Sequence, residues 1–332
     1  MGERIEKTDH YLGYPIKDIC VTCLNDRIES CGFLKGNIRG ICSIALKTRE
    51  HLTGNQKVFE KVVKDNIQFQ IVNQTGAKVL LYSGGMDSFI ISKLENYDVL
   101  LYLDIGSRYS QVEKEWLIRQ NLKNLVIDNR LQLGDVELPD GIVPMRNFFF
   151  AMIGTFYGDY ITLGATSGDR IQDKSKLFAI KTSTILSELH APFHWIPDGR
   201  KIDFNVAFKD FSKVQLIHDY LDKGFSFEDL LTKSFTCYAP IHDKPCGICK
   251  ACARKWIALY HFTYTVERKK LLFSSFVGNP AGYWEGERID AVIKNQKEKN
   301  EMYRGCEDDD TIKAWELYKK DEKDLGKILF DI

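Results

Sequence analysis

Residues 78–94 have the sequence KVLLYSGGMDSFIISKL, and this stretch decides the fold. The apolar run at 78–82 is short and rich in branched and aromatic side chains, which is typical of a buried strand. Gly84 and Gly85 then predict a tight turn, and residues 89–94 begin a helix. A strand that passes through a glycine turn into a helix predicts the start of an α/β domain.

The same order of elements repeats further along the chain. Strands are expected over residues 98–104, 125–127 and 160–163, with helices over residues 111–124 and 147–157. Near-continuous apolar strands that alternate with helices predict a doubly wound parallel sheet. Such sheets bind ligands where the strands end, and Gly84, Gly106 and Gly164 all follow predicted strands.

The composition is that of an ordinary globular protein. The chain has 332 residues, of which 44% are hydrophobic and 28% charged, and its formal net charge is zero. A nucleic-acid partner would therefore need a local basic patch. No apolar run approaches the ~18 residues that span a bilayer, and residues 1–18 are too polar and charged for a signal peptide. We expect a cytoplasmic protein with no membrane partner.

The pattern divides the chain into four parts. Residues 1–75 form an N-terminal extension of weak periodicity, and residues 76–235 hold the α/β domain. Residues 236–256 contain a group of cysteines, and residues 257–332 form a charged and mostly helical C-terminal extension. Two short helices are expected late in the α/β domain, over residues 212–223 and 227–233.

The turn after the first strand has the composition of an anion-binding loop, made of Ser83, Gly84, Gly85, Met86, Asp87 and Ser88. Its glycines let the backbone approach an anion, and the N–H groups and dipole of the first helical turn stabilise negative charge. Asp87 can hold a divalent cation or organise the loop. No Gly-Lys-Ser/Thr follows, so the loop is not a Walker A motif. An ordinary strand–turn–helix capped by Asp87 or Ser88 has the same pattern.

This loop, SGGMDS, resembles the SGGxDS loop of the PP-loop ATPase superfamily, which includes adenylating synthetases and tRNA-modifying enzymes. The resemblance implies an adenine nucleotide alpha hydrolase-like, HUP-type fold. It also implies that the loop binds the pyrophosphate of ATP while AMP is transferred to an oxygen of the substrate. A loop that stabilises departing pyrophosphate lowers the barrier to attack on the α-phosphate.

Eight of the nine cysteines fall into two groups of four. The second group, Cys237, Cys246, Cys249 and Cys252, has the spacing C-x8-C-x2-C-x2-C, with Gly247 in its tightest turn. Clustered cysteines in a chain without a secretion signal indicate metal ligands before disulfides. Four thiolates close a tetrahedral zinc site and leave no open position, which makes the metal structural. An iron–sulfur cluster fits the same C-x2-C-x2-C run.

The first group, Cys20, Cys23, Cys31 and Cys42, has a more irregular spacing. A second zinc site and four plain buried thiols both fit that spacing. Cys306 stands alone.

The second cysteine group resembles the zinc signature of the 7-cyano-7-deazaguanine synthase (QueC-like) family of PP-loop ATPases. Its matching parts are TCY at 236–238 and CGICKAC at 246–252. DIGSR at 104–108, with Glu113 further on, resembles the family's D-Y-G-Q-R segment, and VPMRN at 143–147 resembles V-P-G-R-N. Gly164, Asp173 and Phe178 resemble a G…D…F loop, and Lys213 the lysine of W-x-x-K. The order and spacing agree across about 180 residues.

The resemblance implies an ATP-dependent C–N ligase that takes 7-carboxy-7-deazaguanine and ammonia. The family adenylates the carboxylate, forms the amide, adenylates again and yields the nitrile preQ0, for queuosine-type or deazaguanine modification of nucleic acid. The implied cofactors are ATP, Mg²⁺ and Zn²⁺. The implied cofactor-binding residues are Ser83, Gly84, Gly85, Met86, Asp87, Ser88 and Arg108.

The implied catalytic residues are Asp87, Arg146 and Lys213, and the implied substrate-binding residues are Asn147 and Asp173. A planar guanidinium suits a phosphate or carboxylate, and Lys213 would neutralise charge that develops during adenylation. Asp173 would accept hydrogen bonds from a guanine-like edge. Plainer alternatives are solvated surface charges at Arg146 and Lys213 and a turn residue at Asp173.

The sequence departs from the family pattern in the segment that faces the base. Met145 stands where the family has glycine, and DKSK at 173–176 stands where the family has an Asp-Cys-Arg-like run. Lys255 occupies the basic position after the last cysteine, with Arg254 beside it. The two extensions have no counterpart in the compact family pattern.

Three functions are therefore open. The first is a ligase acting on a 7-deazaguanine acid. The second is a QueC-like PP-loop ATPase that adenylates a tRNA base, a protein or a modified nucleotide, with Cys20 and Cys23 as a candidate catalytic pair for thiolation. The third is a degenerate PP-loop protein that serves as a binding module, against which the intact SGGMDS argues. A homodimer and a nucleic-acid or protein partner also stay open.

Overall fold

The computed structural model describes residues 76–139, 141–192, 199–241 and 244–330, with side chains up to residue 322. It also describes two short antiparallel strands, β1 (His10–Tyr11) and β2 (Tyr14–Pro15). Contacts divide the chain into Met1–Gln70 and Ile71–Ile332, and the second unit holds the features described below. The first cysteine group, Cys20, Cys23, Cys31 and Cys42, lies outside the described residues.

A five-stranded parallel sheet forms the centre of the second unit. Its strands are β3 (Lys78–Leu81), β4 (Val99–Leu103), β5 (Leu125–Asp128), β6 (Tyr160–Leu163) and β7 (Asp203–Asn205). They lie in the order β5-β4-β3-β6-β7, and every neighbouring pair is parallel. The chain builds outward from β3 to one edge and then crosses to the other side of β3. This is the predicted doubly wound fold.

Alternate strand residues face two separate hydrophobic cores. Leu80 and Tyr82 belong to the first core, whereas Val79 and Leu81 belong to the second, because successive side chains on a strand point to opposite faces. The helices that contribute to the first core on this side are α5 (Met86–Leu94), α6 (Ser110–Arg119), α9 (Lys213–Asp222) and α10 (Phe227–Thr232).

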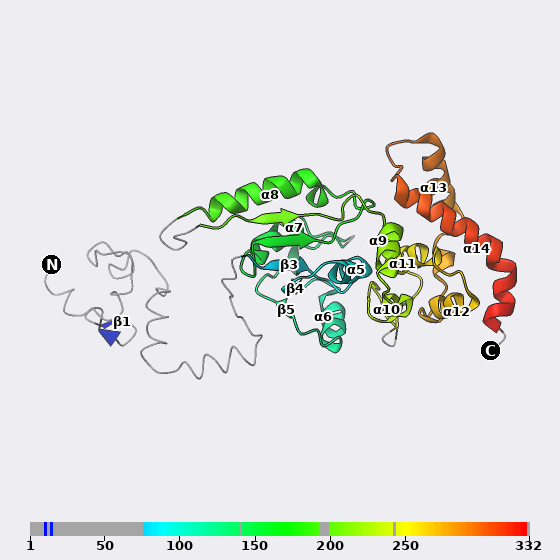
Figure 1. Cartoon of the computed structure of the whole chain (residues 1–332), viewed down its shortest axis with the longest axis horizontal. Coiled ribbons are helices and arrows are strands. Elements are labelled where there is room, and N and C mark those ends of the chain that lie inside the picture. Colours follow the sequence, from blue (N-terminus) through cyan, green and yellow to red (C-terminus); the bar gives the residue numbers. More distant parts are fainter. Residues whose placement is uncertain are drawn as a thin grey trace. The chain divides into compact units, whose positions relative to one another are not determined.

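The opposite face of the sheet is covered by α7 (Arg146–Gly154) and α8 (Lys176–Leu189). In Figure 1, α8 lies on one side of the strands and α6 on the other. Two short 3₁₀ helices, η2 (Gly134–Val136) and η3 (Gln172–Lys174), lie in the loops that follow β5 and β6. Both faces of the sheet are therefore buried, as a parallel sheet requires.

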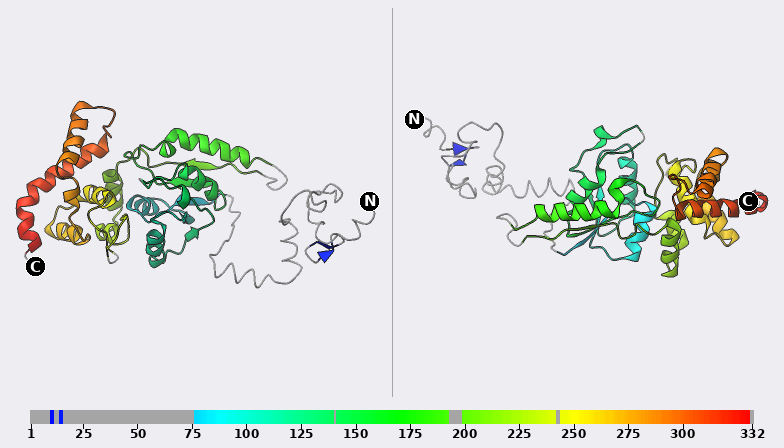
Figure 2. Two further views of the ribbon diagram at one scale, coloured as in Figure 1. Left: turned by 180° about the vertical axis from the view of Figure 1, so that it is seen from behind. Right: turned by 90° about the horizontal axis from the view of Figure 1, so that it is seen from above.

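The C-terminal third is helical, as predicted. It consists of α11 (Lys250–Tyr260), α12 (Val266–Ser274), the 3₁₀ helix η4 (Pro280–Tyr283), α13 (Glu287–Glu298) and α14 (Cys306–Phe330). The ring of Trp256, which is fully buried, contacts Tyr260, Phe273 and Tyr318. These residues share the first core with α5 and α9, and Figure 2 shows the C-terminal helices gathered at that end of the unit.

Several predicted boundaries were wrong, and some elements were not predicted at all. α5 begins at Met86 rather than at residue 89, and α6 ends at Arg119, just before Asn121 takes a left-handed backbone with φ of 48°. α8 and β7 were missed. α8 exposes Leu177, Ile180 and Leu189, so its apolar pattern lacks a clear polar face.

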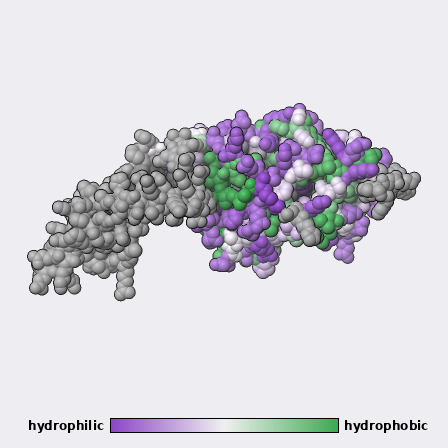
Figure 3. All heavy atoms as spheres, turned by 90° about the horizontal axis from the view of Figure 1, so that it is seen from below, coloured by the Kyte–Doolittle hydropathy of each residue, from purple (hydrophilic) through white to green (hydrophobic). Residues whose placement is uncertain are grey.

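The surface of the second unit is mixed in character. On the face drawn in Figure 3, hydrophilic residues predominate and hydrophobic residues gather in smaller patches. No helix within the described ranges combines the length and apolar character that crossing a membrane would require.

Candidate active site and metal centre

The SGGMDS loop leaves the central strand β3 at its carboxyl end and leads directly into α5. This is the switch point at which doubly wound sheets bind ligands. Gly85 is the N-cap residue of α5, and its cap makes no side-chain hydrogen bond. The prediction that Asp87 or Ser88 serves as an ordinary cap is therefore wrong. The positive end of the helix dipole is left available to an anion.

Gly84 fits the loop closely against its surroundings. It has a φ of 70°, and a Cβ atom there would lie 2.8 Å from Cδ2 of Leu117. Its carbonyl accepts a hydrogen bond of 2.8 Å from the backbone N–H of Phe235. A residue with a side chain would strain the backbone and clash with α6. The loop is thus held between α6 and the segment that leads into Cys237.

Two buried polar groups beside the loop have no hydrogen-bond partner among the described residues. They are Nε1 of Trp116 and Oγ1 of Thr236. Cβ atoms built on Gly84 and Gly85 would lie 3.6 Å from Cδ1 of Trp116 and 3.4 Å from Cγ2 of Thr236. Because buried polar groups are normally hydrogen-bonded, these two side chains fit a polar ligand bound at the loop.

The hydroxyls of the loop are close together. The Ser88 Oγ donates to the Gly85 carbonyl over 3.0 Å and lies 3.5 Å from the Ser83 Oγ. Both hydroxyls come from the ends of the loop, so they flank the two glycines. The predicted loop residues are therefore gathered around one helix N-terminus.

Asp87 is paired with Lys213. The Lys213 Nζ donates to the Asp87 carboxylate, and the two side chains are only 18% and 24% exposed. Burial alone would lower the pKa of Lys213, but the carboxylates of Asp87, Asp169 and Glu307 outweigh it and raise that pKa. Lys213 therefore stays charged, and the alternative of a solvated surface lysine is wrong. Ser212 fixes Lys213 at the start of α9 by a capping box.

A loop after β6 joins this site to the C-terminal extension. Burial would raise the pKa of Asp169, but Lys174 and Lys213 hold that pKa below its usual value. Arg170 Nη1 donates to the Glu301 carbonyl over 2.7 Å. Glu307 packs so closely that a Cβ on the neighbouring Gly168 would lie 2.6 Å from its carboxyl carbon. The extension therefore contributes directly to the surroundings of Lys213.

The predicted substrate-binding segment is also assembled. The Asn147 backbone N–H donates to Asp173 Oδ2 over 3.4 Å, and Asn147 is buried. Asp173 Oδ1 and Arg146 Nε are buried and have no partner in the described part of the chain. Met145 has a φ of 56° and is 66% exposed. A left-handed backbone favours glycine, so the conformation here agrees with the family's V-P-G-R-N pattern.

Glu113 lies next to this segment and has a perturbed pKa. It accepts a hydrogen bond of 3.1 Å from the Tyr102 hydroxyl. Burial raises the pKa of Glu113 to about 7, although the Tyr102 hydrogen bond and the charge of Arg146 oppose the change. A carboxyl group with a pKa near neutrality is one that can exchange a proton under physiological conditions.

Arg108 is placed differently from the other predicted site residues. Its Nε pairs with Glu137 at 2.6 Å, and its Nη2 and Nη1 donate to the carbonyls of Leu138 (2.9 Å) and Pro139 (3.2 Å). None of the contacts described for it is with the SGGMDS loop. Its guanidinium holds the loop that follows β5.

The second cysteine group forms a compact cluster. The sulfur atoms of Cys237, Cys246, Cys249 and Cys252 all lie within 4.8 Å of one another, and those of Cys246 and Cys252 are 3.9 Å apart. A zinc tetrahedron with Zn–S bonds of about 2.3 Å has sulfur–sulfur edges of about 3.8 Å. Backbone N–H groups also donate to the sulfurs of Cys237, Cys246 and Cys249. The four thiols therefore fit a single metal ion.

Gly247 has the predicted role in this cluster. Its φ is 78°, and a Cβ there would lie 2.2 Å from the carbonyl oxygen of Gly278. Gly278 in turn donates its N–H to the Cys246 carbonyl over 2.9 Å. The cysteine cluster is therefore covered by the segment that links α12 to η4.

Lys255 connects α11, the helix that carries Cys252, to the segment that supports the SGGMDS loop. Its buried Nζ donates to the carbonyls of Ser234 (2.7 Å) and Leu231 (3.3 Å). Burial lowers the pKa of Lys255 to about 7. Since Ser234 immediately precedes Phe235 and Thr236, Lys255 positions the segment that supports Gly84 and Gly85.

The fold and site together define a doubly wound α/β protein with the SGGMDS loop at its switch point and a four-cysteine cluster. Residues 102–263 match the family model described as "Queuosine biosynthesis protein QueC", a segment that begins after the SGGMDS loop. This segment of the chain is therefore similar to a QueC-like family.

Individual relatives have low sequence identity to this chain, but the alignments cover almost the full length of each relative. 7-cyano-7-deazaguanine synthase 1 of Colwellia psychrerythraea is 24% identical over 210 residues, which is 53% of this chain and 90% of the relative. The 7-cyano-7-deazaguanine synthase of Chlorobaculum parvum is 24% identical over 213 residues, 53% of this chain and 88% of the relative. That of Marinobacter nauticus is 23% identical over 214 residues, 54% of this chain and 91% of the relative.

Sequence reasoning missed three groups at the site. Thr236 was quoted only as a neighbour of Cys237, although its Oγ1 has no hydrogen-bond partner in the described ranges. Asp169 and Glu307 face Lys213, yet neither belongs to a recognisable motif. Glu307 lies in the first turn of α14, far along the chain, so only the packing of the C-terminal extension could reveal it.

Proposed function

We propose that the chain is an ATP-dependent ligase that adenylates the carboxylate of a 7-deazaguanine acid, as a 7-cyano-7-deazaguanine synthase-like enzyme. The observation that carries the proposal is the SGGMDS loop at the switch point, with a free helix N-terminus and the Asp87–Lys213 pair beside it. The QueC match and the names of the relatives support the substrate class.

In this proposal the phosphates of ATP bind to the N–H groups of the loop and to the hydroxyls of Ser83 and Ser88. Asp87 would hold Mg²⁺ through the oxygen that does not accept from Lys213. Mg²⁺ would supply positive charge to the phosphates when bound. Lys213, kept charged by three carboxylates, would offset negative charge that develops as pyrophosphate departs.

The substrate acid would lie against the segment around Arg146. Arg146 Nε and Asp173 Oδ1, which are buried and unpaired among the described residues, supply one donor and one acceptor. A guanidinium suits a carboxylate, and a carboxylate suits the donor edge of a guanine-like base. Ammonia would then displace AMP to form the amide, and a second adenylation would yield the nitrile.

The four cysteines would hold Zn²⁺ in a structural role. With all four positions occupied by thiolates, the metal would have no open position for substrate. Its contribution would be to fix Cys237, and with it Phe235 and Thr236, against the loop. A cytoplasmic location and a homodimer remain predictions.

A second candidate is adenylation of a different acid by the same site. Lys174, in the segment that departs from the family pattern, is engaged by Asp169 over 3.1 Å. Residues of the C-terminal extension, which the family match does not include, lie beside Lys213. Both features would make the substrate site of this chain differ from that of the compact relatives, and so favour a different acid.

Substrate-dependent release of pyrophosphate tests these proposals. The full chain is incubated with ATP, Mg²⁺, ammonium and 7-carboxy-7-deazaguanine, and the products are identified by mass spectrometry. We expect pyrophosphate, AMP and the nitrile. Pyrophosphate release with another acid but not with this one would favour the second candidate. Absence of release with every acid tested would contradict both.

A further inference from the structure

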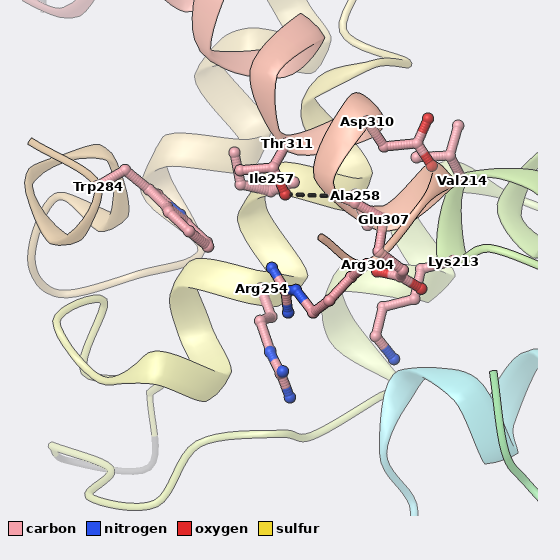
Figure 4. Close-up of a pocket in the computed structure, with 10 residues that line it drawn as sticks. All are labelled: Lys213, Val214, Arg254, Ile257, Ala258, Trp284, Arg304, Glu307, Asp310 and Thr311. Carbon is pink, nitrogen blue, oxygen red and sulfur yellow. Dashed lines mark hydrogen bonds between the residues drawn. The ribbon is translucent and has the colours of Figure 1, made fainter. Parts of the chain in front are cut away.

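A pocket lies next to Lys213, and the C-terminal extension supplies most of its lining residues. Lys213 and Arg254 come from the QueC-matched segment, whereas Arg304 and Glu307 come from the extension. Figure 4 shows Arg304 directed toward Arg254, with Lys213 on the other side of Glu307. Three cationic side chains, from α9, α11 and the turn just before α14, therefore border one space.

The arginines of this pocket are held in different ways. Arg304 Nε and Nη2 contact Asp308 Oδ1 at 2.8 and 2.7 Å, and Asp308 is almost fully buried. Arg254, half-buried, makes no ion pair or hydrogen bond with any residue that the structure describes. Lys250 lies four residues before Arg254 on α11, so two like charges share one side of that helix. Like charges at this spacing repel each other weakly.

None of the carboxylates that line the pocket forms an ion pair with Arg254 within the described residues. Asp308 is already committed to Arg304. Glu307 and Asp310 also line the pocket, and burial is the largest cause that raises the pKa of each. Glu307 Oε1 is buried and has no hydrogen-bond partner within the described ranges.

We propose that this pocket is a phosphate-binding subsite, in which Arg254 and Arg304 contact a phosphate group of a ligand that also reaches the SGGMDS loop. Guanidinium groups match the oxygens of a phosphate in both shape and charge. The phosphate belongs either to the tail of ATP or, if the second candidate function holds, to a nucleotide substrate, since 7-carboxy-7-deazaguanine itself carries no phosphate. The inference rests on the proposed function, because that function places ATP at the neighbouring SGGMDS loop. Its test measures binding and does not require the enzyme to turn over.

The subsite would be an addition to the compact relatives. The family match ends at residue 263, before α12 begins, and the relatives are covered almost to their full length by about half of this chain. Arg304 and Glu307 both lie beyond that point. The extension would thus alter which ligand the site accepts, without changing the loop.

Binding measurements on the full chain test the proposal. One arm titrates a non-hydrolysable ATP analogue, and the other titrates guanosine 5′-monophosphate into protein saturated with that analogue. Arg254→Gln is the principal variant because it breaks no described ion pair. Arg304→Lys retains the charge. Arg288→Gln is the matched control, since Arg288 lies over the ring of Tyr283, outside the pocket.

We expect Arg254→Gln to weaken one of the two titrations by about tenfold or more, whereas Arg288→Gln leaves both unchanged. A loss confined to the ATP analogue assigns the phosphate to ATP, and a loss confined to the monophosphate assigns it to a nucleotide substrate of the second candidate function. Unchanged affinities in both arms, with unchanged melting temperature, would overturn the subsite. These binding results do not depend on the ligase assay, so a failure of that assay would leave the test of the subsite intact.

Discussion

Asp87 and Lys213 form an ion pair although 126 residues separate them in the chain. Asp87 lies in the first turn of α5, and Lys213 is the first residue of α9. The pair therefore joins the loop at the switch point to a later part of the α/β domain. Lys213 also faces Asp169 and Glu307, so it is the cation shared by three carboxylates.

Removal of either partner should stop the reaction but should affect stability differently. Lys213→Gln leaves three carboxylates without their shared cation, so we expect the free energy of unfolding to fall by about 1–3 kcal/mol. Asp87→Asn leaves Lys213 with Asp169 and Glu307 and should cost less. Pyrophosphate release should be lost in both variants, as measured beside urea unfolding.

Lys223→Gln is the control for this pair, because Lys223 is exposed and, in the described part of the chain, its Nζ donates only to the Leu94 carbonyl. It should retain both activity and stability. An Asp87→Asn variant that turns over at the rate of the unaltered chain would show that the loop does not bind the phosphates.

Metal analysis should find zinc bound to the second cysteine cluster. Cys249→Ser removes one thiolate from a closed site, so we expect it to lose one metal ion per chain and to lower the melting temperature. Cys306→Ser should retain the metal, because Cys306 lies outside the cluster and contacts Ser167. Iron with visible absorption would indicate an iron–sulfur cluster, and a metal content unaffected by Cys249→Ser would contradict the site.

The turn between Cys246 and Cys249 should tolerate no side chain at Gly247. In Gly247→Ala the new Cβ would meet the Gly278 carbonyl at 2.2 Å, in addition to the strain of a φ of 78°. We expect a loss of about 2–4 kcal/mol in the free energy of unfolding.

Gly224→Ala separates the two contributions. Gly224 has a φ of 83°, but a Cβ there would meet nothing within 4 Å. We expect this variant to lose only about 1 kcal/mol from backbone strain. Equal losses in the two variants would mean that the contact between the cysteine turn and Gly278 does not matter.

The sequence predicted the parts of the site that depend on local pattern. The run from Lys78 to Leu94 indicated a strand, a glycine turn and a helix, and the structure has all three. The C-x2-C-x2-C spacing likewise indicated a cluster whose sulfur atoms are close together. In both features the residues that cooperate are neighbours in sequence, so their spacing alone limits their geometry.

Contacts between distant segments could not be predicted in that way. Nothing in the residues around Glu307 indicates that α14 begins beside Lys213, since that contact depends on how the C-terminal helices pack around Trp256. β7 has three residues, and its strand partner β6 lies 43 positions earlier by the register of Tyr160 with Asp203. Neither length nor periodicity separates so short a strand from a loop.

Glu113 should make stability depend on pH. Burial raises its pKa from 4.5 to about 7 in the folded chain, so the folded state binds the proton more tightly than the unfolded state. This contribution is fully present below the unfolded pKa and is lost as the pH rises through about 7. The Glu113→Gln variant has no carboxyl group at this position, so it does not lose this contribution to stability as the pH rises. Its melting temperature relative to the unaltered chain should therefore increase between about pH 5 and about pH 8.

The matched control is Glu115→Gln on the same helix, where Glu115 is exposed and accepts a hydrogen bond from Gln111. Its difference in melting temperature from the unaltered chain should stay constant over the same range. A Glu113→Gln difference that also stays constant would mean that Glu113 is already ionised at the lower pH. In that event Tyr102 and Arg146, which both favour the charged carboxylate, would outweigh burial.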